Sequence, residues 1–289
     1  MPELRVEIRS GPQAGQVAAR LARLDERGWL TLAIVDRPGL AALVIGDDSA
    51  DPDADALVDE PVDSLWRDRI EPLARFLAGA EAPPAPKAVL RAHDPRYGVL
   101  AERLLRRVRD ALLSRGIADD IWTFDHIGST SVPGLRAKPY VDLQIGADPL
   151  PVEGSGFDAV LATAGFLPAR GARPDSPGVH RDTVKDPGLA PDEAYRKRLY
   201  VRADPAGPAI LHVRRTGSPW WSYSVLFRDW LRADPAGRQA YEATKVELAR
   251  EHAEDPDYDD YTRAKAAFFD KVQQDYEKLG ETSSYRVRR

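Results

Sequence analysis

A glycine followed by three hydroxyl side chains stands in the segment 126–146, HIGSTSVPGLRAKPYVDLQIG. Gly128 is followed by Ser129, Thr130 and another serine, so a turn here would direct backbone N–H groups and hydroxyls toward one point. Such an arrangement accepts phosphate oxygens. Lys138 stands shortly after the turn and would supply the positive charge that the turn lacks. The alternative is a capped turn whose hydroxyls only satisfy the local backbone, and these residues alone leave both interpretations open.

Two polar side chains alternate with apolar ones in the segment that follows, PYVDLQI, residues 139–145. This alternation is typical of a strand, in which successive side chains point to opposite faces, so Asp142 and Gln144 should share one face. A carboxylate beside a phosphate-binding turn is placed to hold a magnesium ion that also contacts the phosphate. We therefore predict that Asp142 is a catalytic and metal-binding residue and that Gln144 contacts the ligand. The alternative is that both polar residues simply face solvent.

A β-hairpin is predicted around the sequence DPAGP, with strands at 196–203 and 209–215. The second strand carries His212, which is a candidate general base. The first strand carries Lys197 and Arg198, whose positive charge would suit a phosphorylated ligand. The plainer alternatives are a hydrogen-bonded structural histidine and two solvated basic residues.

The segment DHIGSTSVPGLRAKPYVDLQIG closely resembles the signature of the GrpB family, a member of the nucleotidyltransferase superfamily. The resemblance continues in order through YRKRLYVR, ILHVRRTGSPWW, LFRDWLRADPAGRQAYEATKVELA and YTRAKAAFF, and so covers roughly residues 87–280. It implies a nucleotidyltransferase-like α/β fold, with a mixed sheet followed by C-terminal helices.

The resemblance also implies roles for particular residues. In the superfamily a Gly-Ser turn holds nucleotide phosphates, and a strand with two acidic residues, assisted by a third on a neighbouring strand, holds magnesium. Here Gly128 and Ser129 match the turn and Asp142 matches the first acid, whereas Gln144 occupies the second position and His212 stands where a third acid is expected. Because a neutral amide binds magnesium poorly, the sequence favours one magnesium ion or none over a two-metal mechanism.

Two kinds of function follow from these residues. One is an enzyme that binds a nucleotide or another phosphorylated small molecule and transfers a nucleotidyl or related group. The other is a non-catalytic module that senses a nucleotide or assists a protein partner, which the missing second acid favours. The sequence leaves the choice open.

The N-terminal segment LRVEIRSGPQAGQVAARL is similar to the opening strand, phosphate loop and helix of dephospho-CoA kinase, and LWRDRIEPLARFL resembles the last helix of that kinase. Against the pattern G-x-x-x-x-G-K-[ST], however, the chain has Gln16 in place of the lysine and Val17 in place of the hydroxyl. The resemblance therefore implies a degenerate relic, not an active dephospho-CoA kinase. The expected division is a small α/β region at 1–80, a linker rich in Ala and Pro at 81–89, and the GrpB domain at 90–289.

The composition sets further limits. The chain of 289 residues is 43% hydrophobic and 30% charged, which is typical of a folded globular protein of one or two domains. A net charge of −5 does not favour nucleic acid, and the lack of cysteine excludes disulfides and thiolate chemistry. With no apolar run of a signal peptide or a membrane span, we expect a cytoplasmic protein.

The remaining segments give coarser expectations. Periodicity predicts helices at 16–27, 62–78, 95–115, 157–165, 219–232, 235–252 and 259–279, and strands at 4–9, 29–45 and 121–127. The helix at 62–78 should be interrupted near Pro72. The acidic stretch after residue 45 should be a solvated loop, and the aromatic residues of RRTGSPWWSYSVLFRDW should lie in a core instead of stacking on RNA.

Overall fold

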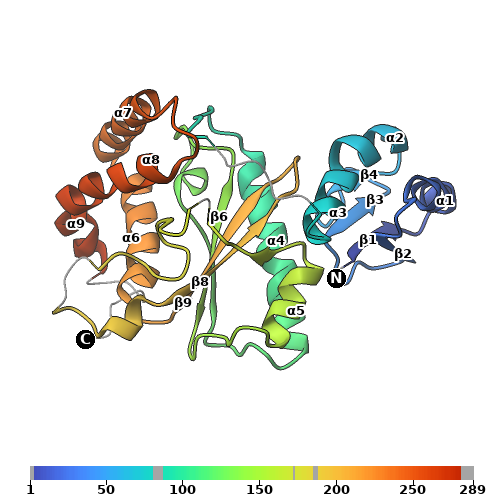
Figure 1. Ribbon diagram of the computed structural model, residues 1–289, viewed down its shortest axis with the longest axis horizontal. Coiled ribbons are helices and arrows are strands. Elements are labelled where there is room, and N and C mark those ends of the chain that lie inside the picture. The colour runs from blue at the N-terminus through green and yellow to red at the C-terminus, as the bar shows by residue number, and fades with distance from the viewer. Residues whose placement is uncertain (1–2, 81–86, 172, 185–187, 281–289) are drawn as a thin grey trace.

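The computed structural model describes residues 3–80, 87–171, 173–184 and 188–280, which form two separate β-sheets with helices packed on them (Figure 1). The first sheet belongs to the N-terminal region, and the second belongs to the part of the chain that carries the predicted site. The sequence-based expectation of a mixed α/β protein with C-terminal helices and a small N-terminal α/β region is confirmed.

The N-terminal sheet is entirely parallel, with the strand order β2-β1-β3-β4. Its elements are β1 (Leu4–Arg9), α1 (Ala14–Leu24), β2 (Leu30–Val35), β3 (Leu43–Gly46), β4 (Ala56–Leu57), α2 (Val62–Leu65) and α3 (Glu71–Leu77). The extended run predicted at 29–45 is thus two strands. The helix predicted at 62–78 is interrupted just before Pro72, as expected, by a π-helical turn at Trp66–Ile70 that separates α2 from α3. Pro72 itself lies in the first turn of α3, a position that proline tolerates.

The second sheet is mixed and has the order β5-β6-β9-β8-β7. Its strands are β5 (Thr123–Ile127), β6 (Val141–Ala147), β7 (Leu167–Pro168), β8 (Lys197–Arg202) and β9 (Ala209–Arg215). The predicted hairpin is β8 and β9, which pair antiparallel, and β9 also pairs with β6 in parallel. Through this parallel pairing, the hairpin lies beside the strand that carries Asp142.

The two faces of this sheet are covered by different helices (Figure 1). The helices α4 (Arg96–Ser114) and α5 (Gly156–Thr163) form one core with apolar sheet residues such as Leu143 and Val213. On the other side lie α6 (Pro219–Ala233), α7 (Pro235–Glu251), α8 (Asp259–Ala264) and α9 (Ala266–Gly280). The helix predicted at 259–279 is therefore interrupted at Lys265. Trp221, Phe227 and Trp230 of α6 are buried, which confirms their assignment to a core.

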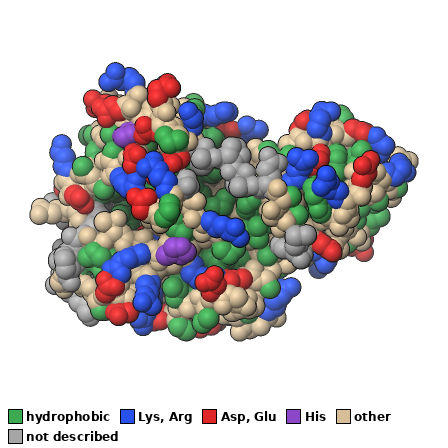
Figure 2. All heavy atoms as spheres, viewed as in Figure 1, with side chains coloured by type: hydrophobic (Ala, Val, Ile, Leu, Met, Phe, Trp, Pro, Cys, Tyr) green, Lys and Arg blue, Asp and Glu red, His purple; other side chains and the backbone are tan. Residues whose placement is uncertain are grey.

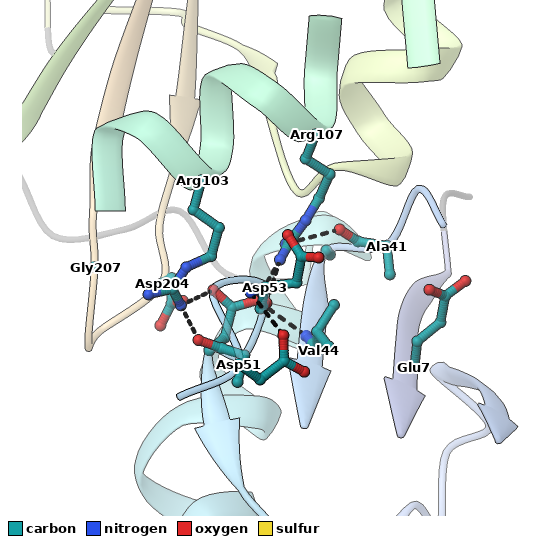
Figure 3. A network of polar contacts seen from close by, with 12 residues as sticks. Glu7, Ala41, Val44, Asp51, Asp53, Arg103, Arg107, Asp204 and Gly207 are labelled. Carbon is teal, nitrogen blue, oxygen red and sulfur yellow. Dashed lines mark hydrogen bonds and ion pairs between the residues drawn. The ribbon is translucent and has the colours of Figure 1, made fainter. Parts of the chain in front are cut away.

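A network of buried ion pairs connects the N-terminal region to α4 and to the β8–β9 turn (Figure 3). Arg103 and Arg107 of α4 are paired with the carboxylate of Asp55 at 2.9 and 3.0 Å. The side chains of Asp55 and Asp204 have no exposed surface. Asp204 binds Arg202 at 2.6 Å and a second arginine from the π-helical turn at 2.8 Å. The acidic stretch is thus only partly the solvated loop that the sequence suggested, because its Asp55 is buried by pairing.

The division into 1–80, 81–89 and 90–289 stays a proposal, and most of its linker, residues 81–86, lies outside the described residues. On the face shown in Figure 2, basic and acidic side chains are intermingled over the C-terminal helices and over the N-terminal region. None of the helices in the described ranges is long and apolar enough to cross a lipid bilayer.

Candidate functional site

The hydroxyl turn packs directly against Asp142. Strand β5 ends at Ile127, which pairs with Asp142 of β6, and the next residue, Gly128, has a φ of 70° and a ψ of −171°. This conformation is close to exclusive to glycine. A Cβ at this position would lie 2.8 Å from the Cβ of Asp142 and closer still to its carboxylate. Gly128 is therefore required both by its backbone conformation and by the approach of the acid.

A cavity of about 40 Å³ lies beside this turn. Its polar lining combines the turn with Asp142, with Lys138 and with lysines from two distant segments. The residues that line it are Leu90, Ser129, Thr130, Ala137, Lys138, Tyr140, Asp142, Ile210, Lys245, Tyr261 and Lys265. The side chain of Asp142 is 31% exposed, so its carboxylate is accessible from this cavity.

The three lysines are held by aromatic rings and by the turn, and no carboxylate forms an ion pair with them in the described part of the chain. Lys245 of α7 donates hydrogen bonds to Oγ of Ser129 at 3.1 Å and to a backbone carbonyl. The Nζ atom of Lys138 lies 3.4 Å from the ring centre of Tyr258, and that of Lys265 lies 4.8 Å from the ring centre of Tyr261. Neither of these two ammonium groups has a hydrogen-bond acceptor among the described residues.

Burial shifts the pKa of every member of the cluster toward its neutral form. Burial, with the nearby charge of Lys265, lowers the pKa of Lys138 to about 7 and that of Lys245 to about 7, against a smaller opposing effect of Asp142. Burial also lowers the pKa of Lys265 itself, and it raises the pKa of Asp142 although the lysines act in the opposite direction. An anion in the cavity would offset the repulsion between the ammonium groups and raise their pKa values toward the ordinary range.

His212 stands behind Asp142 with its two ring nitrogens in different surroundings. Its Nδ1 lies 3.0 Å from Nζ of Lys197 and 3.3 Å from a guanidinium nitrogen of Arg214, so Nδ1 accepts a hydrogen bond and the ring proton is on Nε2. Nε2 is 3.8 Å from Oδ1 of Asp142. Burial and these two cations hold the pKa of His212 well below its usual range. The base role stays a prediction, and this geometry favours His212 instead as a neutral N–H donor toward the cavity.

A buried carboxylate is paired with both cations beneath the histidine. Asp182 accepts hydrogen bonds from Arg214 at 2.7 and 3.0 Å and is paired with Lys197 at 3.1 Å. Arg214 also donates to Oε1 of Gln144 at 2.7 Å, while Nε2 of Gln144 donates to the carbonyl of Trp221 at 3.0 Å. Both polar ends of Gln144 are thus engaged inside the protein, and its side chain is buried.

The structure brings together most of the predicted residues but separates two of them. Gly128, Ser129, Thr130, Lys138 and Asp142 lie at the cavity, and His212 and Lys197 lie next to it. Gln144 is buried away from the cavity lining, where it is hydrogen-bonded to Arg214. Arg198 points to the opposite side of the sheet, where it binds Asp158 of α5 at 2.8 Å, because neighbouring residues of a strand face opposite ways.

Several residues of the site were missed by the sequence reasoning. Lys245 and Lys265 come from helical segments far along the chain, and Asp182 comes from the irregular region before β8. One signal was available: Lys245 stands four residues after Tyr241, on the buried face of α7, where a lysine is uncommon. No comparable pattern points to Asp182.

The donor set bears on the predicted magnesium ion. Asp142 is the single carboxylate that lines the cavity, and no group of three Asp, Glu or His side chains in the described ranges is arranged to hold a metal. Magnesium is commonly bound through one or two carboxylates together with substrate phosphates. The residues present would therefore hold magnesium only jointly with the phosphate oxygens of a ligand.

Comparison with known proteins gives one family over most of the chain. The sequence model of the GrpB protein family matches residues 87–275. A UPF0157 protein of Streptomyces coelicolor is 36% identical over 174 residues, which cover 60% of this chain and 76% of that protein. The crystal structure of a conserved GrpB protein from Enterococcus faecalis matches with a TM-score of 0.44 and 21% identity, over 66% of this chain and 98% of that one.

Other relatives carry a different name. A dephospho-CoA kinase of Mycolicibacterium paratuberculosis is 31% identical over 259 residues, which cover 86% of this chain and 60% of that protein. Since 86% of the chain is more than the part that follows residue 86, the match includes some of the N-terminal region. The resemblance to these kinases predicted from the N-terminal sequence is thus confirmed. The chain spans 43–60% of the length of the dephospho-CoA kinases that it matches.

Proposed function

Because this chain belongs to the GrpB family, we propose that it is a nucleotidyltransferase-like protein whose cavity beside Asp142 binds the phosphate of a nucleotide or another phosphorylated small molecule. The observation that carries the proposal is the set of three lysines around one hydroxyl turn, two of which have no acceptor in the described part of the chain. Ion pairs that serve only stability bring a carboxylate to each cation, whereas a surplus of buried or partly buried cations favours the binding of an anion from outside.

Transfer of a nucleotidyl group is the catalytic form of this proposal. Asp142 would hold a magnesium ion together with the phosphate oxygens, and the metal would supply Lewis-acid stabilisation of the phosphoryl group. Ser129 and Lys245 would fix the phosphate against the turn, and Lys138 would oppose the charge that develops on it. His212 would donate its Nε2 proton as a hydrogen bond to an oxygen near Asp142.

A non-catalytic binding module is the second candidate, and the hydrogen bonds of Gln144 favour it. Where the family signature implies a second acid, the structure has a neutral amide that is fully engaged with Arg214 and the chain. Such a site keeps the groups that bind phosphate but has a single carboxylate for metal. The protein would then report the presence of a nucleotide to a partner.

We do not propose dephospho-CoA kinase activity for this chain, although some of its relatives carry that name. The loop after β1 lacks the lysine and hydroxyl of a phosphate loop, and at this edge of the sheet Arg9 is paired with Asp51 at 2.6 Å. We propose that the N-terminal region has a structural role, which it performs through the ion pairs of Asp55 and Asp204.

The experiment is calorimetric titration of ATP, GTP, CTP and UTP into the full chain, first in EDTA and then with magnesium. We expect binding in EDTA that depends on the lysines, so Lys245→Met should weaken it at least tenfold. Lys271→Met, which removes an exposed lysine from α9, is the matched control and should bind as the parent does. If all four nucleotides fail to bind under both conditions, the proposal is wrong for nucleotides and the phosphorylated metabolites must be tested next.

The same titration separates the two candidates. Binding that magnesium strengthens, and that Asp142→Asn makes insensitive to magnesium, supports a transferase and justifies a search for the acceptor. Equal binding with and without magnesium in both proteins supports the non-catalytic module.

A further inference from the structure

We infer that the ligand presents a phosphate monoester to this cavity, that is, a terminal phosphate with three unbridged oxygens and two negative charges, and not an internal phosphodiester. This inference rests on the proposed function and specifies the chemical class of its ligand. It stands on the size of the cavity, on its charge and on the nature of its walls.

The size of the cavity matches one phosphoryl group. A volume of about 40 Å³ corresponds to a few water molecules and is far below the roughly 300–1,000 Å³ of cavities that enclose a whole cofactor. A terminal phosphate would fill it while the rest of the ligand stays outside. A diester would need room for a carbon substituent on each side of the phosphorus atom.

The charge of the cavity matches a dianion. Lys138, Lys245 and Lys265 contribute three positive charges when protonated and Asp142 contributes one negative charge, which leaves a surplus of two. Beneath His212, Lys197 and Arg214 share the single carboxylate of Asp182, so these residues contribute no negative charge that would offset the surplus. A monoester with a second pKa near 6 carries close to two charges at neutral pH, whereas a diester carries one.

The walls of the cavity combine a few apolar side chains with polar ones. Leu90, Ala137 and Ile210 line it without any side-chain donor, and the donors Ser129 and Lys245 converge from the side of the turn. The rings of Tyr258 and Tyr261 lie against Lys138 and Lys265. Next to Tyr258, Asp257 forms a salt bridge of 2.9 Å with Arg173. Unbridged oxygens would meet the donors, and the ester carbon would leave through the less polar part.

The test compares methyl phosphate with dimethyl phosphate, which differ by one ester bond and one charge. Each is titrated calorimetrically into the full chain at pH 7 in EDTA. We expect methyl phosphate to bind at least tenfold more tightly than dimethyl phosphate. Lys245→Met should abolish this preference, Lys271→Met should keep it, and circular dichroism should show both variants folded.

The possible results separate this inference from the proposed function. Equal binding of the two esters, or tighter binding of the diester, overturns the inference and leaves a phosphate site in place. Nucleotide binding with no binding of methyl phosphate also overturns it, because the phosphate would then not be the group that the cavity recognises. If neither esters nor nucleotides bind, the proposed function fails as well.

Discussion

Two clusters of buried charge, on opposite sides of the C-terminal sheet, are built on different principles. In the network that joins α4 to the N-terminal region, the fully buried carboxylates of Asp55 and Asp204 are each paired with two arginines. In the cavity beside Asp142, three lysines surround one carboxylate, and all three contact aromatic rings. The first cluster is complete within the chain, and the second becomes complete only with an anion.

The pKa shifts in the two clusters reflect this difference in pairing. Arginines hold the pKa of Asp55 and that of Asp204 below the usual range in spite of burial, because each carboxylate is surrounded by opposite charge. In the cavity the lysines have their pKa lowered and Asp142 has its pKa raised, because burial is not offset by partners. A buried cluster whose members all shift toward their neutral forms is typical of a functional site.

The largest expected effect concerns the paired network. Asp55→Asn leaves Arg103 and Arg107 without their shared carboxylate, and breaking a buried pair in this way costs about 3–5 kcal/mol of unfolding free energy. Asp53→Asn is the matched control, because that side chain is 33% exposed and its pair with Arg106 should contribute less than about 1 kcal/mol. Urea unfolding measures both. Similar losses for the two variants would show that the network is not the main attachment of the N-terminal region.

A second prediction concerns the turn that shapes the cavity. Gly128→Ala must adopt a backbone conformation nearly exclusive to glycine, which costs about 1–3 kcal/mol, and it must also displace the carboxylate of Asp142. We expect a larger loss of stability than for Gly154→Ala, where φ is 75° but a Cβ would meet open space. Phosphate binding, followed by calorimetry with methyl phosphate, should fall only in the first variant. A Gly128→Ala protein that binds as the parent does would contradict the assigned geometry.

A third prediction is a pH dependence of stability that distinguishes the cavity from the network. Lys138 and Lys245 have a pKa of about 7 in the folded protein, whereas an unfolded lysine has a pKa near 10.4, so between these values the unfolded chain binds more protons. Stability should therefore rise as the pH increases from 7.5 to 9.5, by at most about 1.4 kcal/mol per pH unit for each lysine. Urea unfolding at several pH values, without phosphate, measures this slope.

A substitution tests the origin of that slope. Lys245→Met should reduce it, since a buried lysine that is 1% exposed has been replaced by a neutral side chain of similar length. Lys271→Met on the surface of α9 should leave it unchanged. If the parent instead loses stability over this pH range, folding does not disfavour the charged form of these lysines. The cavity would then not hold a surplus of positive charge.

The sequence by itself determined the local parts of this protein. Gly128 and the hydroxyls after it predicted the turn, the alternation around Asp142 predicted β6, and the sequence DPAGP predicted the hairpin of β8 and β9, because turns and strands follow from neighbouring residues. The order of the motifs also indicated the family. The alternation could have separated Lys197 from Arg198 as well, since adjacent strand residues face opposite sides of a sheet.

Only the tertiary structure decided which of these parts meet. Nothing in the local pattern states that β9 lies parallel to β6, which brings His212 next to Gln144 in register, or that α7 crosses the turn so that Lys245 reaches Ser129. These contacts depend on how the apolar faces of α6, α7 and α9 pack together over the turn. The periodicity of a strand or helix shows which way each side chain points but not which residue it contacts. The lysines that give the cavity its charge could therefore be assigned only from the tertiary structure.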